Sequence, residues 1–187
     1  PGSDSGLLFA MMPFIEPGDE VLVPDPSYPS NFLNPKLLGG RAVSVLLDEA
    51  NGFRLTRAAL EAALSPRTKM VLLTNPNNPT TTVFSREEMT MLAEFVIEHD
   101  LVAVVDQAFE DFLFDGREMV TLAALPGMWE RTVTVCSVSK GMALSGVRVG
   151  YLVADDHIMD VLYGCAVNVI GATNSTFQAA VAYAMDH

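Results

Sequence analysis

The sequence predicts an α/β fold in which a mostly parallel β-sheet lies between two layers of helices, a three-layer α/β/α arrangement. Short runs rich in β-branched residues alternate with stretches of helical periodicity, which is typical of parallel strands joined by helices. Several of these runs are continuously apolar, as expected for strands buried on both faces. The six expected strands are Val21–Val23, Ala42–Leu47, Met70–Thr74, Val102–Asp106, Val133–Ser137 and Val149–Ala154.

Helices are expected between these strands. The clearest begins at Ser85, which can cap the helix, and has Glu87 and Glu88 in its first turn, where acidic residues are favoured. Thr56 holds a similar cap position. The expected helices are Ser5–Ile15, Pro29–Leu38, Thr56–Leu64, Ser85–His99 and Asn174–Met185.

One connection between strands differs from the others. The stretch from Ser137 to Val149 contains Gly141 and Gly146 and is short for a helical crossover. Parallel strands need a long crossover, whereas antiparallel strands do not. We therefore expect the strand that begins at Val149 to run antiparallel to its neighbour.

Composition restricts the class of protein. The 187 residues are 50% hydrophobic and carry a formal charge of −12, enough apolar material for one domain core. The acidic pI of about 4.4 argues against nucleic acid or an anionic membrane as a partner. Cys136 and Cys165 form no C-x-x-C pair, and no signal peptide or long apolar run is present. We expect a reducing, cytoplasmic environment.

The two ends of the sequence indicate a fragment of a longer protein. The chain has no initiator Met, and a Gly/Ser turn opens it before any strand. The amphipathic stretch Asn174–Met185 is still helical in pattern near the last residue, His187. We therefore expect a single domain over residues 1–187 that lacks an N-terminal segment and further C-terminal sequence.

Polar residues gather where three of the expected strands end. The carboxyl ends of parallel strands meet at one edge of an open α/β sheet, where ligands bind. An amide, a carboxylate and an amine are thereby expected to lie close together. The residues at these strand ends are Asn75, Asn77, Asn78, Asp106, Ser137, Ser139 and Lys140.

The turn Gly2–Gly6 leads directly into a helix and is a candidate anion site. Free backbone N–H groups and the positive end of a helix bind phosphate well. The alternative is an ordinary helix-capping turn. The chain contains neither a P-loop with G-K-[ST] nor a G-x-G-x-x-G dinucleotide fingerprint.

Lys140 and Asp106 are the candidate reactive groups. Of the three lysines, Lys36 and Lys69 are expected at the surface, whereas Lys140 follows a buried strand among small residues. Shielding from water there favours the neutral, nucleophilic amine. The alternatives are a surface lysine for Lys140 and a helix cap or half an ion pair for Asp106. Beside a pyridine nitrogen, Asp106 would keep that nitrogen protonated.

These motifs together resemble the class I/II aminotransferases, pyridoxal-phosphate enzymes of fold type I. The resemblance covers essentially the whole chain, and the motifs follow the family's order and approximate spacing. It implies the large, cofactor-binding domain of these enzymes, with pyridoxal 5′-phosphate as the cofactor. The motifs that carry it are Pro17–Pro29, Asn75–Thr80, Asp106, Ser137–Lys140 and Ser145–Tyr151.

The resemblance implies a role for each residue around the cofactor ring. Lys140 forms a Schiff base with the cofactor and later carries a proton between the substrate Cα and the cofactor. Asp106 pairs with the pyridinium nitrogen, and Asn78 hydrogen-bonds the phenolic oxygen. Tyr28 stacks on the face of the ring.

The resemblance also implies a phosphate site. The backbone amides of Ser3 and Asp4, the hydroxyl of Ser137 and the guanidinium of Arg148 hold the phosphate. Arginine suits this task because its planar fork can bond two oxygens at once. The resemblance implies no metal.

Three positions depart from the family pattern. Phe109 stands where the family often has a tyrosine that hydrogen-bonds the phenolic oxygen. Thr81 stands where glycine is usual, so the turn must avoid a positive φ or tolerate strain. Asp4 brings a carboxylate to the phosphate site, where it would repel the phosphate unless Arg148 offsets it.

The resemblance implies transfer of an amino group from an amino acid to a 2-oxo acid. Two alternatives share this core: another fold type I enzyme such as a carbon–sulfur β-lyase, and the effector domain of an aminotransferase-like transcription regulator. In the family, a C-terminal small domain and a partner subunit complete the substrate site. We therefore expect a homodimer of the full-length protein and expect that the isolated fragment is inactive.

The Phe109 departure generates the first prediction. Without a donor to the phenolic oxygen, the deprotonated Schiff base at Lys140 loses support, so we expect it to hold its proton to a higher pH than in Phe109→Tyr. A spectroscopic pH titration of both proteins checks this. Coinciding curves would contradict it.

Overall fold

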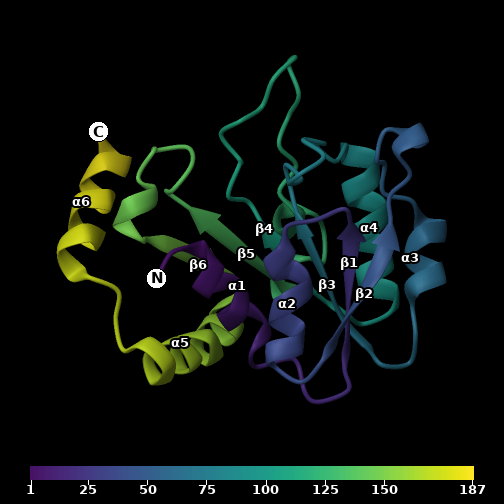
Figure 1. Ribbon diagram of the computed structural model, residues 1–187, viewed down its shortest axis with the longest axis horizontal. Helices are drawn as coiled ribbons and strands as arrows, with labels where there is room; N and C mark the ends of the chain where they lie inside the picture. The colour runs from purple at the N-terminus through teal and green to yellow at the C-terminus, as the bar shows by residue number, and fades with distance from the viewer.

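The computed structural model describes all 187 residues and has the predicted three-layer architecture. One six-stranded sheet with the order β2-β1-β3-β4-β5-β6 forms the central layer (Figure 1). All neighbouring strands are parallel except β5 and β6, which are antiparallel, so the expectation for the strand after Ser137 is confirmed. The strands are β1 Glu20–Asp25, β2 Arg41–Leu46, β3 Thr68–Thr74, β4 Val102–Asp106, β5 Thr132–Ser137 and β6 Gly150–Val153.

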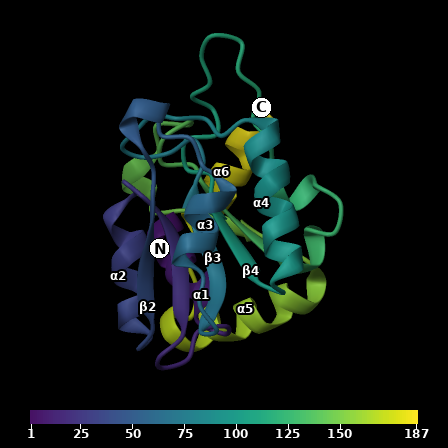
Figure 2. The ribbon, with the colours of Figure 1, turned by 90° about the vertical axis from the view of Figure 1, so that its right-hand side faces the viewer.

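α1 to α5 form the two outer layers, which Figure 2 shows on either side of the sheet, whereas α6 packs through Val181 against Val138 and Val149 in the segment after β5. α1, α2 and α5 contribute to one hydrophobic cluster with one face of the strands, and α3 and α4 to a second cluster on the other face. The helices are α1 Ser3–Met11, α2 Pro29–Leu37, α3 Arg57–Ala63, α4 Arg86–Glu98, α5 Asp156–Ile170 and α6 Ser175–Asp186.

β3 shows why the sequence of a central strand is continuously apolar. Met70 and Leu72 belong to the cluster on the side of α1, whereas Val71 and Leu73 belong to the cluster on the side of α4. All four side chains are fully buried. Successive side chains of a strand point to opposite faces, so a strand between two helical layers has no polar face.

The strand order reverses direction between β1 and β3. The chain passes outward from β1 to β2, returns across β1 to β3, and then proceeds through β4 and β5 to the other edge. In doubly wound sheets the crevice for ligands opens at such a reversal, outside the carboxyl ends of the strands. Figure 1 shows these ends pointing toward the same edge of the sheet, where the loop after β4 projects outward.

Side-chain caps fix several helix ends. Ser85 accepts a hydrogen bond from the Glu88 backbone N–H, and the Glu88 carboxylate accepts one from the Ser85 N–H, forming a capping box at the start of α4. Thr56 and Asn174 cap α3 and α6 more simply, because their side chains accept hydrogen bonds from the Ala59 and Phe177 N–H groups. The predicted ends of these three helices therefore agree with the structure to within one or two residues.

α5 is a helix that the sequence pattern did not predict. Its second half contains Gly164 and two β-branched valines, Val167 and Val169, which have low intrinsic helix propensity. Tertiary contacts support the helix instead: Leu162 is buried in the cluster with α1, and Ile158 and Met159 pack against it. Asp155 caps its first turn by accepting a hydrogen bond from the His157 N–H.

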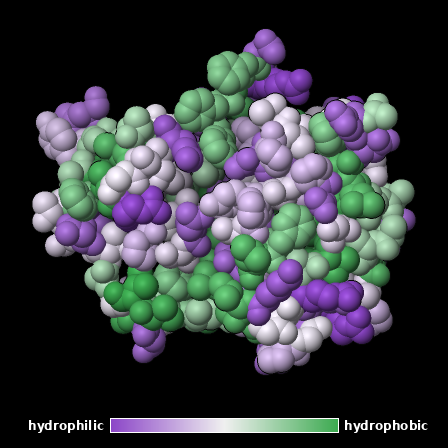
Figure 3. Space-filling view, viewed as in Figure 1, coloured by the Kyte–Doolittle hydropathy of each residue, from purple (hydrophilic) through white to green (hydrophobic).

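The outer surfaces of α5 and α6 are apolar. Hydrophobic residues gather over α5 at the lower left of the space-filling view in Figure 3. Val161, Tyr163 and Val169 of α5 and Tyr183 of α6 are all exposed, and Val181 is the one buried residue of α6. None of the six helices is long and apolar enough to cross a membrane.

Thr81, one of the three positions that depart from the family pattern, has a strained backbone conformation. Its φ is 59°, so the turn adopts the left-handed backbone region that its usual glycine would favour. A β-branched residue in this region is strained, at a cost on the order of 1–3 kcal/mol. Thr81 is exposed and makes a backbone hydrogen bond to the Asn77 carbonyl. The turn therefore tolerates strain rather than avoiding the conformation.

We predict that Thr81→Gly raises the free energy of unfolding by about 1 kcal/mol, because glycine adopts this φ without strain. Thr82→Gly is the matched control: Thr82 has no positive φ, so glycine there should lower stability by roughly 0.5–1 kcal/mol. Urea unfolding followed by circular dichroism measures both. Equal destabilisation by the two substitutions would show that Thr81 is not strained.

Candidate active site

A cavity of about 140 Å³ opens at the carboxyl edge of the sheet, close to the reversal of strand order. All eight residues to which the family resemblance gave a role contribute to its wall, although they lie far apart in the sequence, whereas Asn75 and Asn77 do not line it. Ala108, Phe109, Ser139 and Ser145 also line it, and the sequence analysis gave these no binding role. The predicted residues in the wall are Ser3, Asp4, Tyr28, Asn78, Asp106, Ser137, Lys140 and Arg148.

The N-terminus of α1 forms one end of the cavity. No side chain caps this helix, and its first intrahelical bond is from the Gly6 N–H to the Gly2 carbonyl. The amides of Ser3 and Asp4 therefore have no partner within the helix. Such free N–H groups, together with the helix dipole, form a site for an anion.

Arg148 is locked against this helix end. The Gly2 N–H donates to the Arg148 carbonyl at 2.9 Å, and Arg148 Nη1 donates to the Ser145 carbonyl at 2.8 Å. Gly2 has a φ of 75°, and a Cβ on it would lie 2.5 Å from Arg148 Nη2. Only glycine at this position lets the guanidinium lie beside the free amides.

Hydroxyl groups complete the same end of the cavity. Ser137 ends β5, and its Oγ accepts a hydrogen bond from the Ser139 N–H at 3.2 Å, which holds the turn before Lys140. Ser139 and Ser145 join Ser3 and Ser137 in the wall. Their occurrence just before and after Lys140 was the sequence signal for them. Four hydroxyls, two free amides and a guanidinium suit a phosphate dianion.

Asp106 lies in the same cavity and is 5% exposed. Its Oδ1 accepts a hydrogen bond from the Ala108 N–H at 3.1 Å, and none of the seven salt bridges in the structure involves it. Burial raises the pKa of Asp106 to about 6; the Ala108 N–H opposes this rise, and the Asp4 carboxylate adds to it. A buried carboxylate without a cation can hold a protonated ring nitrogen.

Lys140 follows β5 in a turn closed by a hydrogen bond from the Ala143 N–H to the Lys140 carbonyl. Its side chain lines the cavity but is exposed to solvent, so the expectation that Lys140 is shielded from water is wrong for this chain. The Phe109 ring is its aromatic neighbour, with Nζ 5.8 Å from the ring centroid.

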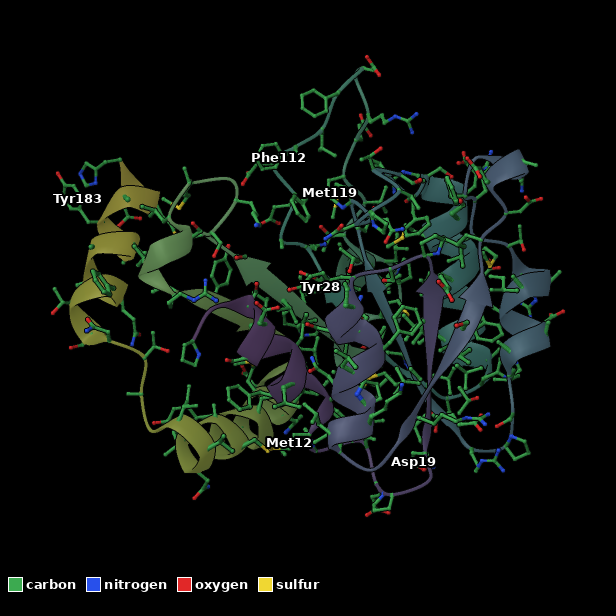
Figure 4. The ribbon with its side chains drawn as sticks, viewed as in Figure 1. Met12, Asp19, Tyr28, Phe112, Met119 and Tyr183 are labelled. Atoms are coloured by element: carbon green, nitrogen blue, oxygen red, sulfur yellow. The ribbon has the colours of Figure 1, made fainter.

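Tyr28 and Asn78 approach the cavity from the two strands at the reversal. Tyr28 precedes α2 directly and lies at the end of that helix nearest the cavity, below Phe112 and Met119 of the loop after β4 (Figure 4). A hydrogen bond with Ser30 lowers the pKa of Tyr28, but burial and the nearby carboxylate of Asp4 together raise it. Asn78 is half-buried in the turn after β3.

Asp4 does point toward the cavity, as the third departure anticipated. Its carboxylate Oδ2 lies 4.0 Å from Arg148 Nη2, and both side chains are about half exposed. Asp4 also raises the pKa of Asp106 through space. Asp4 and an anion at the helix N-terminus would therefore share Arg148 as their countercharge.

The fold and the cavity together define a class of protein. A doubly wound sheet with a lysine just after a strand, a buried carboxylate at the end of the adjacent strand and a phosphate-type cradle at a helix N-terminus is the large domain of fold type I enzymes. Comparison with known proteins agrees. Residues 1–187 match the family described as aminotransferase class I and II, and the chain belongs to this family.

Several relatives carry specific names. An aspartate aminotransferase of Musicola paradisiaca is 33% identical over 178 residues, which are 95% of this chain and 44% of that protein. Human kynurenine–oxoglutarate transaminase 1 is 33% identical over 191 residues, covering 97% of the chain and 45% of the relative. The chain spans less than half the length of these curated relatives.

Solved structures show the same likeness. The structure titled as an aromatic aminotransferase from Pyrococcus horikoshii OT3 has a TM-score of 0.96 and 31% identity, covering all of this chain and 50% of that one. N-succinyldiaminopimelate aminotransferase from Mycobacterium tuberculosis has a TM-score of 0.93 and 31% identity, covering 99% of this chain and 48% of that one.

The geometry around Arg148 predicts that Asp4 weakens anion binding. We expect Asp4→Asn to tighten binding of inorganic phosphate by about 1 kcal/mol, roughly fivefold at low salt. The substitution removes a negative charge that competes with the phosphate for the Arg148 guanidinium, about 4 Å away. Isothermal titration calorimetry measures the affinity. Asp156→Asn, in the first turn of α5, is the control and should leave it unchanged. Equal effects of the two substitutions would refute a local role for Asp4.

Proposed function

We propose that residues 1–187 form the pyridoxal-phosphate-binding large domain of an aminotransferase that moves an amino group from an amino acid to a 2-oxo acid. The observation that supports this most is the meeting of Lys140, Asp106 and the cradle of Arg148 in one cavity. We further propose that the whole protein is a cytoplasmic homodimer, with an N-terminal segment and a C-terminal small domain outside these residues.

The polar groups that line the cavity fit two parts of the cofactor, its phosphate group and its ring nitrogen. The free amides at the start of α1, the serine hydroxyls and Arg148 match a phosphate group, and the space beside Gly2 is kept free because this residue has no Cβ. The buried Asp106 carboxylate matches a pyridinium nitrogen, since it has no cation of its own. Asn78 would bind the phenolic oxygen, and Tyr28 would lie against the ring.

When bound, the cofactor supplies an electron sink for the negative charge that develops at the substrate Cα. The residues of this chain do the remaining work. Asp106 in its ionised form keeps the ring nitrogen protonated. Lys140 would hold the cofactor, and its amine is the group that would carry the proton of the substrate Cα. Phe109 cannot donate a hydrogen bond to the phenolic oxygen.

The same core could serve β-elimination in a carbon–sulfur lyase or effector binding in a transcription regulator. The relatives described above are an aspartate aminotransferase and a kynurenine–oxoglutarate transaminase, which favours amino transfer. An assay of the full-length protein separates the enzymes: transfer yields a new amino acid from the 2-oxo acid, whereas β-elimination releases pyruvate and ammonia.

We predict that the protein forms an absorbing adduct with pyridoxal 5′-phosphate, and that borohydride reduction fixes the adduct on Lys140. Peptide mapping by mass spectrometry identifies the site. Lys140→Arg should abolish the adduct, whereas Lys36→Arg and Lys69→Arg, at exposed positions away from the cavity, should retain it. A reduced adduct spread over all three lysines, or none on Lys140, would contradict the proposal.

A further inference from the structure

Asn77 is a buried polar residue that lies just outside the cavity wall, although the next residue, Asn78, is part of that wall. The side-chain Nδ2 of Asn77 donates two hydrogen bonds, to the Pro26 carbonyl at 3.0 Å and to Thr80 Oγ1 at 2.8 Å. Pro26 follows β1 directly and lies two residues before Tyr28. One amide group therefore joins the turn that carries Asn78 to the segment that carries Tyr28.

The bond to Pro26 fixes the orientation of the Asn77 amide. A carbonyl oxygen can only accept a hydrogen bond, so the nitrogen of the amide has to face it. Both hydrogens of this nitrogen are used, whereas Asn77 Oδ1 has no hydrogen-bond partner. The side chain is therefore held by its two donated bonds alone.

Backbone hydrogen bonds hold Asn77 itself in place. Its N–H donates to the Thr82 carbonyl at 2.7 Å, and its carbonyl accepts from the Thr81 N–H at 2.9 Å. These two bonds close the turn after β3. Asn78 lies within the closed turn, so its position depends on the position of Asn77.

Asn31 makes a second connection between the same parts of the chain. Nδ2 of this buried residue of α2 donates to Ser27 Oγ at 2.9 Å and to Thr74 Oγ1 at 3.0 Å. Thr74 is the last residue of β3. Asn31 thus ties the segment before α2 to the strand, whereas Asn77 ties it to the turn beyond the strand.

We propose that Asn77 is a positioning residue, which fixes the placement of Tyr28 relative to Asn78 through its bond to the Pro26 carbonyl. Tyr28 and Asn78 approach the cavity from the two strands at the reversal. The bond from Asn77 is the one hydrogen bond between residues 26–28 and residues 75–82. The role of Tyr28 and Asn78 toward a cofactor ring rests on the proposed function; the link itself does not.

Exchange of the Asn31 amide hydrogen tests the link without cofactor. The Asn31 N–H donates to the Tyr28 carbonyl at 2.9 Å, so its exchange reports how firmly the start of α2 is held. We expect Asn77→Leu, which has a similar size but no donor, to speed this exchange about fivefold in NMR of the folded protein. Thr80→Val removes the other acceptor and leaves the bond to Pro26, so it should keep the wild-type rate.

Binding of two probes separates positioning from general damage to the core. Pyridoxal 5′-phosphate engages the ring contacts as well as the phosphate-type cradle, whereas inorganic phosphate engages the cradle alone. We expect Asn77→Leu to weaken binding of pyridoxal 5′-phosphate by about fivefold to tenfold and to leave the affinity for inorganic phosphate unchanged. Asn34→Leu replaces a buried asparagine of α2 whose Nδ2 has no partner, and this matched control should change neither affinity. If Asn77→Leu does not fold, Asn77→Ala makes the same test.

Three results would overturn the positioning role: a wild-type exchange rate at Asn31 in Asn77→Leu, an equal acceleration in Thr80→Val, or equal weakening of both probes. Failure of the proposed function gives a different result. The wild-type protein would then form no adduct at Lys140, while exchange at Asn31 would still respond to Asn77→Leu. An adduct at Lys140 with unchanged affinity for pyridoxal 5′-phosphate in Asn77→Leu would refute the positioning role alone.

Discussion

The parallel pairing of β3, β4 and β5 is the constraint on which the whole cavity depends. Thr74 pairs with Asp106, and Asp106 with Val135, so the three strands end at nearly the same level. A slip of one residue would turn each side chain to the opposite face of the sheet. Asp106 would then face the cluster around α4 instead of the cavity. The buried apolar residues on both faces hold the register, because a slip by one residue moves the side chains of a strand from one cluster to the other.

The phosphate-type cradle depends on a contact between distant parts of the chain. α1 opens the sequence and Arg148 lies after β5, yet a backbone bond joins Gly2 to Arg148. Close packing also requires a residue without a side chain at Gly150, because a Cβ there would lie 2.7 Å from the Ser3 amide nitrogen. Two glycines without side chains therefore allow the helix end, the guanidinium and the last strand to meet.

Charge balance in the cavity is uneven. Asp4 and Arg148 lie near each other at the exposed end, whereas Asp106 is buried without a salt bridge at the other. Because a buried charge without a partner is unfavourable, the hydrogen bond from the Ala108 N–H is what favours ionisation of Asp106. The chemistry proposed for this cavity requires that ionised form.

The sequence by itself determined most of the architecture. The strands, the helices with capping residues and the antiparallel β6 follow from local periodicity, caps and loop length, which neighbouring residues decide. The eight cavity residues were also predictable, because strand ends converge on one edge in any doubly wound sheet and because the motifs resemble a known family. The tertiary structure alone decided the helix α5, the positive φ of Thr81, the exposure of Lys140 and the contact of Asn31 with Thr74. Some of these features depend on contacts between side chains that are distant in the sequence, such as Asn31 and Thr74, which are 43 residues apart. Others depend on how the surrounding structure holds a turn. A local sequence pattern records neither kind of information.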